Sequence, residues 1–395
     1  MIFSKVSIGE VVSLRQGFAI NKNTKHHMSN EPTDLHLLRI GDMKDGSYSI
    51  YVKDTIPAHF IANEDDIIYT RTGQVGLVFR KQHGVIHNNC FSVTPQNEDV
   101  LDRGFLFYVL QTKEFYEEAN SKASGAAQPD LPHGAFNSIS IPIPDIDIQR
   151  KISNILESYD DLIENNQKQI KLLEEAAQRL YKEWFVDLRF PGHENIEIVD
   201  GVPDGWKKGN VGHLFKTVLG GTPSRNIADY WGGDIPWINS GEVNKLRIIK
   251  ESEFITGRGL NNSSTKLMPK HTTVLAITGA TLGQVSYTEI ETCANQSVVG
   301  VYDETGEYSA YIYLCITNEI KKIISEAIGG AQQHINKEVV NKFELLLPSF
   351  DVNERMKAIV VPMFDKITNL YFEIERLSEA RDRLLPKLMS GEIEV

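Results

Sequence analysis

The side chains that could carry out chemistry are scattered along the chain, and their spacing fits no common catalytic centre. Cys90, Cys293 and Cys315 lack the paired spacing of a zinc site. Two acid-x-lysine triplets, Asp42-Met43-Lys44 and Glu319-Ile320-Lys321, could each supply part of a metal-dependent nuclease centre, but no suitably spaced Pro-Asp precedes either one. We therefore expect this chain to carry no catalytic residues and no metal site.

Other catalytic loops are missing as well. The sequence contains no GxxxxGK[ST] phosphate loop, no HExxH string, and neither the Pro-Pro nor the Pro-Cys dipeptide that methyltransferases of DNA bases use to grip a flipped base. The pair His26-His27 lies in a polar stretch that is typical of a solvated loop. Three scattered cysteines indicate a reducing compartment, and neither a signal segment nor an apolar run of about 18 residues occurs. We expect a cytoplasmic protein that does not contact a membrane.

Length and charge bound the function further. With 395 residues, of which 41% are hydrophobic, the chain can form two or three domains with real cores. The net charge is −12, and residues 145–200 alone hold 13 acidic side chains against 7 basic ones. Half of the negative charge therefore sits in one short segment. This distribution excludes a protein that is basic throughout, but it leaves room for a local basic surface that binds nucleic acid.

The elements that position these side chains are repeated. Sliding the chain against itself gives matches at an offset of 204 residues, which pair Gly125, Ala127, Gln128 and Pro144 with Gly329, Ala331, Gln332 and Pro348. Earlier in each half the match is looser, at an offset of 206 or 207, where Thr72-Gly73 answers Thr278-Gly279. Each half therefore consists of a globular segment followed by a long helix.

The first long helix is predicted over residues 145–190. Positions that are mostly apolar alternate at spacings of four and three, which indicates a coiled-coil seam: Ile148, Ile152, Ile155, Tyr159, Leu162, Asn166, Gln169, Leu173, Ala176 and Leu180. Asn166 and Gln169 are the polar members. They could fix the register of the helix pair, or they could contact something outside it.

The second long helix is predicted over residues 349–395. Pro362 lies inside it, so we expect a bend or a restart at that point. A helix of about 38 residues spans about 57 Å, which is too long to pack inside one small domain. We therefore expect the two helices to pair with each other and with a partner.

The globular segments, residues 1–144 and 207–348, are predicted to mix strands and helices, with a linker at 191–206. In the first, Ile67–Tyr69 and Leu77–Phe79 flank the Thr72–Gly76 turn and predict a hairpin; Val274–Ile277 and Gln284–Tyr287 predict its counterpart. The fold class is therefore α+β, with two globular α/β domains in tandem, each followed by a long helix.

The order of these parts resembles a known family. A Pro-ended strand precedes each long helix (Ile141–Pro144 and Leu345–Pro348), and the second half opens with Leu219-Gly220-Gly221-Thr222-Pro223-Ser224. With the central helix Ile148–Phe185, these features resemble the specificity (S) subunit of Type I restriction-modification systems. The resemblance covers essentially the whole chain. Two positions depart from it: Pro362 interrupts the second helix, and the first half has Gln16–Ala19 in place of the Gly-Gly-Thr-Pro-Ser form.

The resemblance implies two target recognition domains that each read half of an asymmetric, bipartite site in double-stranded DNA. The internal repeat itself predicts that the two halves are related by a pseudo-two-fold rotation, so we expect the two helices to pair as an antiparallel coiled coil. The helices would dock two modification (methyltransferase) subunits and the restriction (translocase-nuclease) subunits. S-adenosylmethionine, ATP and Mg²⁺ would be bound by those partner subunits, and no cofactor by this chain.

Under this resemblance, polar side chains in Gly-rich loops become candidates for DNA contacts, because Arg, Asn, Gln, Ser and Thr can bond to base edges. The candidate DNA-binding residues are Lys22, Lys25, Arg71, Thr72, Gln74, Gln128, Thr222, Ser224, Arg225, Asn239, Ser240, Thr278, Thr281, Gln332, Gln333 and His334. The candidate subunit-docking residues are Tyr159, Asn166, Trp184, Phe185, Ile367 and Leu370.

Two other functional classes remain open from the sequence. The chain could be a two-domain DNA-binding regulator that acts without enzymatic partners. It could also be a coiled-coil scaffold whose globular domains bind protein. Copurification with a methyltransferase subunit and binding to a specific DNA sequence are the properties that distinguish these classes.

Overall fold

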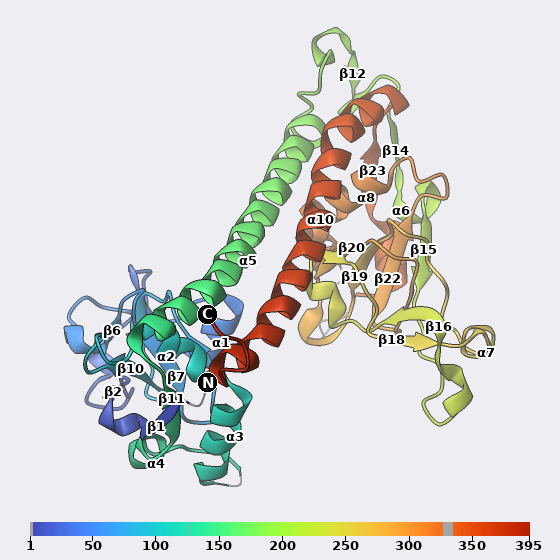
Figure 1. Cartoon of the computed structure of the whole chain (residues 1–395). Helices are drawn as coiled ribbons and strands as arrows, with labels where there is room; N and C mark the ends of the chain where they lie inside the picture. Colours follow the sequence, from blue (N-terminus) through green and yellow to red (C-terminus); the bar gives the residue numbers. More distant parts are fainter. Residues whose placement is uncertain (1–2, 126, 327–334) are drawn as a thin grey trace. The chain divides into compact units, whose positions relative to one another are not determined.

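The computed structural model describes residues 3–125, 127–326 and 335–395. They form two units: unit 1 comprises residues 1–162 together with 377–395, and unit 2 comprises residues 163–376. The long helices α5 (Ile146–Tyr181) and α10 (Phe350–Met389) each begin in one unit and end in the other (Figure 1). Each unit therefore contains one globular domain and one segment of both helices.

The globular domain of unit 1 is built from short strands and helices. In chain order they are β1 (Ser4–Ser7), β2 (Val12–Gln16), β3 (Met28–Ser29), β4 (Leu35–Leu38), α1 (Ile40–Asp45), β5 (Tyr51–Val52), β6 (Ile61–Ala62), β7 (Ile67–Thr70), β8 (Val78–Phe79), β9 (Gly84–Ile86), β10 (Cys90–Pro95), α2 (Arg103–Val109), α3 (Lys113–Lys122), α4 (His133–Asn137) and β11 (Ser140–Ile143). The predicted hairpin is confirmed, because β7 and β8 pair antiparallel.

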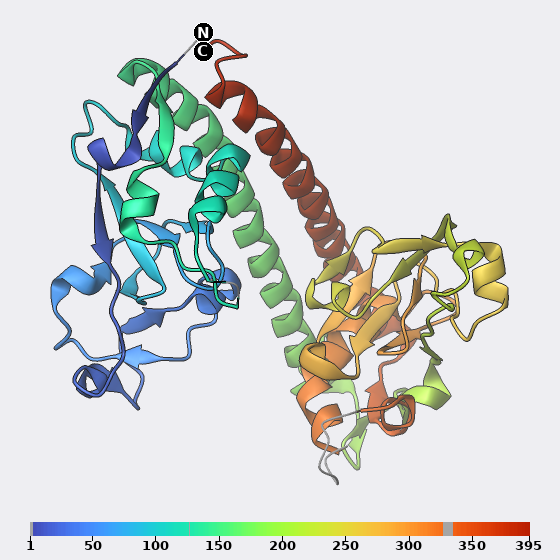
Figure 2. The ribbon, with the colours of Figure 1, turned by 90° about the horizontal axis from the view of Figure 1, so that it is seen from below.

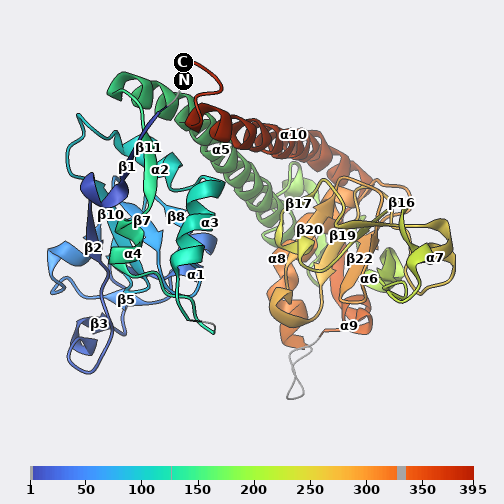
Figure 3. The same cartoon turned by 60° about the horizontal axis from the view of Figure 1, so that its bottom comes forward.

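Two sheets organise this domain. The strands β2, β10, β7 and β8 lie side by side in one sheet, and β3, β5, β4, β9 and β6 form the other (Figure 3). Tyr69 and Phe91 on neighbouring strands are fully buried and contact the ring of Phe136 in α4 edge to face. Aromatic and β-branched residues fill the first sheet, because such side chains pack well on a half-buried pleated surface.

The globular domain of unit 2 repeats this plan with longer elements. In chain order they are β12 (Ile198–Val199), β13 (Val202–Pro203), β14 (Lys207–Asn210), α6 (Val211–Leu214), β15 (Lys216–Leu219), β16 (Trp231–Ile238), β17 (Arg247–Ile248), β18 (Glu253–Ile255), α7 (Gly257–Asn261), β19 (Thr273–Ala276), β20 (Val285–Thr288), β21 (Cys293–Ala294), β22 (Val298–Tyr302), α8 (Ser309–Glu326), α9 (Lys337–Lys342) and β23 (Glu344–Leu347). The main sheet has the order β15-β22-β19-β20-β17.

The internal repeat is visible in matching backbone contacts. In unit 1 the strands β1 and β11 pair, and the amide of Ile8 donates to the carbonyl of Ile139. In unit 2 the strands β14 and β23 pair, and the amide of Val211 donates to the carbonyl of Phe343. These positions differ by 203 and 204 residues, so the offset found in the sequence is confirmed by the fold.

Both long helices are continuous. The helix α5 passes into a π-helical turn, Lys182–Val186, before it ends, and α10 runs unbroken from Phe350 to Met389 (Figure 2). The restart expected at Pro362 is therefore wrong. A proline removes a single backbone hydrogen bond, and in this helix the buried neighbours Val360 and Phe364 hold the surrounding turns in the core of unit 2.

Within each unit the two helix segments run in opposite directions. In unit 1, Arg381 of α10 bonds to Asp160 of α5, and Lys151 bonds to the carbonyl of Val395 at the end of the chain. In unit 2, Ile170 and Ile374 line one hollow, whereas Arg355 reaches the carbonyl of Pro191. As one helix advances along the chain, its neighbour returns, so the predicted antiparallel pairing is confirmed in both units.

The predicted seam of α5 matches the buried face only in part. Ile152 and Asn166 of that seam are buried, whereas Ile155, Leu162 and Ala176 are exposed. Further buried residues lie one position after predicted ones: Leu156, Ile163, Ile170, Ala177 and Tyr181. At 155/156, 162/163, 176/177 and 180/181 both positions carry apolar or aromatic residues, so periodicity alone could not select the correct face.

Each unit has one large hydrophobic core beside two smaller clusters. No helix in the described ranges is long and apolar enough to cross a bilayer. The core of unit 1 receives Ile152 and Leu156 from α5 and Leu388 from α10. The core of unit 2 receives Tyr181 from α5 and Met356 from α10. Each core therefore depends on side chains from both helices.

Gly17 and Gly220 allow a close backbone approach at equivalent places in the two domains. A Cβ atom on Gly17 would lie 2.2 Å from the carbonyl oxygen of His87, and one on Gly220 would lie 2.1 Å from that of Asn295. We predict that Gly17→Ala and Gly220→Ala each lower the free energy of unfolding by about 1–3 kcal/mol, because the backbone must shift. Urea unfolding monitored by circular dichroism measures this loss.

Gly41→Ala is the matched control, because a Cβ on Gly41 meets no atom within 4 Å and the residue lies in α1. Its unfolding free energy should change by less than about 0.5 kcal/mol or rise slightly. Equal stability of the Gly17 and Gly41 variants would contradict the close approach.

Candidate nucleic-acid interface

Three loops of unit 1 meet at one edge of its main sheet. Since β10 lies antiparallel between β2 and β7, the ends of β2 and β7 and the start of β10 share that edge. The amide of Gly17 donates to the carbonyl of Cys90 at 3.1 Å, and the amide of Arg71 donates to the carbonyl of Asn89 at 2.8 Å. Backbone hydrogen bonds therefore join the loop Arg71–Gln74 and the loop after β2 to the segment at the start of β10.

A fourth segment closes over the same edge. The amide of Gly73 donates to the carbonyl of Pro129 at 2.8 Å, and the amide of Leu131 donates to the carbonyl of Arg71 at 2.9 Å. Gln128, another predicted DNA-binding residue, is exposed in this segment. The structure thus brings Gln128 close to the Arg71–Gln74 loop, although the two lie more than fifty positions apart in the chain.

Arg71 is held by side chains of its own domain. Its Nε and Nη2 donate to the carboxylate oxygens of Asp130 at 3.1 and 2.7 Å, and its Nη1 donates to Oε1 of Gln16 at 3.0 Å. Thr72 donates from Oγ1 to the same Asp130 at 2.5 Å. The hydrogen bonds from Arg71, followed by that from Thr72, hold the pKa of Asp130 below its usual value.

This network gives Arg71 a structural role beside its predicted contact with a base. The guanidinium is one-fifth exposed and already uses both edges of its fork. A base contact would require Arg71 to exchange Gln16 or Asp130 for DNA, so the role remains a prediction. Sequence analysis missed Gln16 and Asp130 as its partners, because nothing in their local pattern reveals a contact across more than fifty residues.

The remaining candidates of unit 1 are accessible. Gln74 is exposed, and its Oε1 accepts a hydrogen bond from Lys44 at 3.5 Å. Lys22 and Lys25 are exposed in the separate loop between β2 and β3. No backbone or side-chain bond among the described residues ties these two lysines to Arg71.

Unit 2 presents the same edge. The amide of Gly220 donates to the carbonyl of Val298 at 3.0 Å, and the amide of Ile277 donates to that of Ser297 at 2.9 Å. The amide of Ile335 donates to the carbonyl of Ile277 at 3.2 Å, as that of Leu131 does to Arg71 in unit 1. Ile277 therefore occupies the backbone position of Arg71, but its side chain is buried in the core of unit 2, whereas that of Arg71 is half-buried at the sheet edge.

Thr278 and Thr281 flank the glycine turn at this edge and are half-buried. Thr222 donates from Oγ1 to Oε1 of Gln296 at 2.5 Å. The predicted residues Gln332, Gln333 and His334 lie outside the described residues. The structure thus places Thr222, Thr278 and Thr281 on the loops that meet at one sheet edge.

Arg225 lies further along the loop that follows β15. Its guanidinium stacks 3.5 Å from the ring centroid of Trp231 and bonds to both carboxylate oxygens of Glu253, at 2.6 and 2.7 Å. These bonds lower the pKa of Glu253. The carbonyl of Ser224 accepts a hydrogen bond from the indole of Trp231 at 3.3 Å. Arg225 is half-exposed and held flat on an aromatic ring.

Asn239 and Ser240 follow β16 on another loop. The side-chain amide of Asn239 donates to Oγ of Ser252, and its oxygen accepts from the amide of Gly241 at 2.7 Å. These bonds stabilise a local turn, which is a common use of asparagine. Both residues are half-buried.

Most of the predicted docking residues have buried side chains. Tyr159 is half-buried, whereas five are buried in this structure: Asn166, Trp184, Phe185, Ile367 and Leu370. Four of these five belong to the core of unit 2. Their role in subunit docking stays a prediction, and their burial gives them a role in the stability of this chain.

Two arginines at the contacts between each domain and the helices were missed by sequence reasoning, one half-buried and one fully buried. Arg80, directly after β8, bonds to Glu157 and Asp160 of α5. Arg247, on β17, is fully buried beside Glu174 of α5. A lone charged residue in a strand carries no pattern that reveals this position. Among the described residues, no three His, Cys, Asp or Glu side chains gather as a metal site requires.

Comparison with known proteins identifies the family. The family model for the Type I restriction modification DNA specificity domain matches residues 3–175 and 203–376. The chain belongs to this family. Its two matched segments cover both globular domains and most of both helices.

Individual relatives agree. The Type I restriction enzyme MjaIX specificity subunit of Methanocaldococcus jannaschii is 27% identical over 338 residues, covering 83% of this chain and 78% of the relative. The HindI specificity subunit of Haemophilus influenzae is 26% identical over 402 residues, covering 83% and 86%. The crystal structure of a Type I S subunit from M. genitalium is 16% identical, covers 98% and 96% of the two chains, and has the same fold with a TM-score of 0.61. These matches do not favour the regulator or the scaffold.

Arg71 and Asp130 allow a test of base reading. If Arg71 contacts a base with two hydrogen bonds, Arg71→Ala should weaken binding by about 1–3 kcal/mol at one half-site only. Asp130→Ala keeps the guanidinium but removes its carboxylate partner, so it should weaken the same half-site less. Competition binding with DNA altered in one half-site at a time measures both effects.

Equal weakening on all sequences would assign Arg71 to a phosphate contact. No weakening at all would leave only the structural role, and the two variants would then lose unfolding free energy to a similar extent.

Proposed function

We propose that this chain is the DNA-specificity subunit of a Type I restriction-modification complex. The observation that carries the proposal is the double match to the DNA specificity domain, over residues 3–175 and 203–376. Each matched segment folds into a domain with the same loop-bearing sheet edge. The chain supplies sequence recognition, and its partners supply the chemistry.

The DNA site is bipartite and asymmetric in this proposal. Each domain reads one half-site through the loops at its sheet edge. Arg71 is half-buried at the sheet edge of unit 1, whereas the equivalent Ile277 is buried in the core of unit 2. An arginine can bond to guanine, and a buried isoleucine cannot contact a base, which supports different half-sites.

The helices set the distance between the half-sites. With 36 and 40 residues, α5 and α10 are about 54 and 60 Å long. Two domains that read the same face of B-DNA need centres about 34 Å apart, or a multiple of that distance. Helices of this length suffice for one turn of DNA even when they are inclined to its axis.

The partners are two modification subunits and the restriction subunits, which assemble with this chain in the cytoplasm. S-adenosylmethionine, ATP and Mg²⁺ are bound by those subunits in this proposal. Five large apolar side chains are exposed on the helices, and we expect them to lie at the docking surfaces: Ile155, Leu162, Leu172, Ile359 and Phe372. They replace the buried docking candidates as the first residues to substitute.

The function is tested by reconstitution. We predict that the purified chain alone neither methylates nor cleaves DNA. Together with the modification subunit of its own system, the chain should direct methylation to one bipartite sequence with a fixed spacer, which long-read sequencing of methylated DNA would detect. Methyl transfer by the chain alone would contradict the proposal, as would an uninterrupted target sequence.

A second test concerns the helices. Gln169 and Glu373 lie level on the antiparallel pair, since the adjacent residues Ile170 and Ile374 line the same hollow. Inserting one heptad after both positions lengthens the pair by about 10 Å, or about three base pairs at about 3.4 Å each. The methylated site should keep both half-sites and acquire a longer spacer. A changed half-site with an unchanged spacer would contradict the role of the helices.

A further inference from the structure

Arg247 is buried where unit 2 joins its globular domain to both long helices. None of its side chain is exposed to solvent. Its guanidinium lies 4.3 Å from the ring centroid of Phe364 on α10 and 4.7 Å from that of Tyr313 on α8. The carboxylate of Glu174 on α5 lies 3.5 Å away. One side chain from strand β17 thus contacts both long helices and α8.

The charge of Arg247 is balanced mainly by two carboxylates and aromatic faces. Its Nη1 donates to the carbonyl of Leu246 at 2.9 Å, whereas Nε and Nη2 make no hydrogen bond. Glu289 lies 3.9 Å from Nε and is also bonded by Thr368 of α10 at 2.7 Å. Burial alone lowers the pKa of Arg247, but Tyr313 and Glu174 raise it above its usual value. The arginine therefore stays charged and attracted to both helices.

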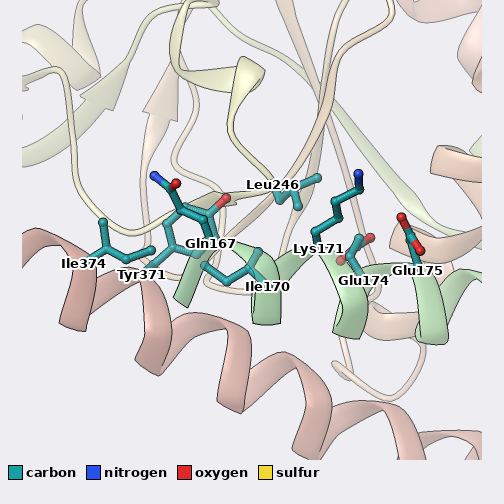
Figure 4. A pocket seen from close by; sticks show the side chains of 8 residues that line it. All are labelled: Gln167, Ile170, Lys171, Glu174, Glu175, Leu246, Tyr371 and Ile374. Carbon is teal, nitrogen blue, oxygen red and sulfur yellow. The ribbon is translucent and has the colours of Figure 1, made fainter. Parts of the chain in front are cut away.

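Apolar packing beside this charge is incomplete. A hollow of about 400 Å³ lies between the domain and the helices, next to Glu174 (Figure 4). Leu246 lines it from the domain, and Ile170, Tyr371 and Ile374 line it from the helices. Dispersion forces weaken steeply across a gap, so packing contributes less to the orientation of the domain on the side of the hollow. The ion pair of Arg247 with Glu174 and its contacts with the rings of Tyr313 and Phe364 lie beside this hollow.

Unit 1 has an arginine in the corresponding place, from a different strand. Arg80 lies 4.3 Å from the centroid of Phe107 and 5.4 Å from that of Tyr108, and it bonds to Asp160 at 3.0 Å. Arg381 of α10 bonds to the same Asp160.

The repeat makes this agreement specific. Asp160 and Phe364 are 204 residues apart, and Tyr108 and Tyr313 are 205 apart. The two arginines occupy positions that are not equivalent in the repeat. Each nevertheless contacts an equivalent residue of a long helix, Asp160 or Phe364, and an equivalent tyrosine, Tyr108 or Tyr313. The molecule thus has two arginine joints: Arg247 contacts both helices, and Arg80 contacts α5 and is linked to α10 through Asp160 and Arg381.

We propose that Arg247 is a positioning residue, which fixes the orientation of the second recognition domain on the helices and thereby makes the complex selective for one spacer length. This inference rests on the proposed function. A change of one base pair moves a half-site by about 3.4 Å along the DNA and turns it by about 34–36°. A domain held rigidly on its helices rejects such a displacement, whereas a domain with a loosened joint follows it in part.

The test replaces Arg247 together with Glu174, so that no unpaired buried charge is left behind. Arg247→Met alone leaves Glu174 buried without its partner and should destabilise the chain. The double variant Arg247→Met, Glu174→Met replaces the pair by apolar side chains, a change that is often neutral for stability. Glu289 keeps Lys270, His271 and Thr368 as partners. The double variant should therefore fold as the original chain does.

Methylation rates are measured with the full-length chain and its modification subunit on DNA whose spacer is one base pair shorter, unchanged or longer. In the double variant, the preference for the original spacer over its neighbours should fall by about tenfold, which is about 1.4 kcal/mol of discrimination. Preference for each half-site sequence should stay the same. An unchanged spacer preference in the double variant, with methylation intact, would overturn the role of Arg247.

Two control variants separate positioning from stability. Val360→Ala removes buried volume from α10 and should lower the unfolding midpoint with the spacer preference unchanged. Lys250→Ala, Glu375→Ala removes an exposed ion pair between the domain and α10, which contributes little. If Val360→Ala also loses spacer preference, the effect follows stability and the proposal is wrong. If the unaltered chain directs no methylation to a bipartite site, the proposed function fails instead.

Discussion

Neither long helix has a core of its own, and the rest of the structure depends on that constraint. A helix of 36 or 40 residues is stable in water only when its apolar face is covered. The first turns of α5 and the last turns of α10 complete the core of unit 1, and the remaining turns complete that of unit 2. Each domain therefore folds onto two segments far apart in the chain, and the last residues of the chain help to stabilise the first domain.

The same constraint explains which parts of the fold the sequence predicts. Local spacing predicts the repeat, the hairpins after β7 and β19, and both long helices. This spacing does not depend on which residues cover the helices. The buried face of α5 could not be chosen, because Ile155 and Leu156, or Leu162 and Ile163, offer apolar groups on adjacent faces. Buried polar residues, such as Gln149 and Glu174, mislead further, since their partners lie in the globular domains.

The candidate interface divides in a similar way. Glycines at Gly73 and Gly279 have positive φ angles, so the turns that carry Thr72 and Thr278 were predictable from sequence. The antiparallel sheet then brings the ends of distant strands together, which explains why the loops converge. The partners of Arg71 were not predictable, because Gln16 and Asp130 reach it only through that sheet edge. The polar residues of the loops could be identified from the sequence. Which of them bond within the domain and which are free to contact DNA could be seen only in the structure.

A repeated protein that reads an asymmetric site must vary its loops without loosening its frame. The structure separates these tasks along each domain. At the sheet edge, Arg71 of unit 1 is replaced by the buried Ile277 in unit 2. The strands β1 and β11, like β14 and β23, keep the same pairing. Each joint to the helices is then made by an arginine that reaches an equivalent place from a different strand. The attraction of a cation to a tyrosine face and to a helix side chain does not depend on which strand carries the cation. The domains can therefore diverge in sequence and still be held on their helices in the same manner.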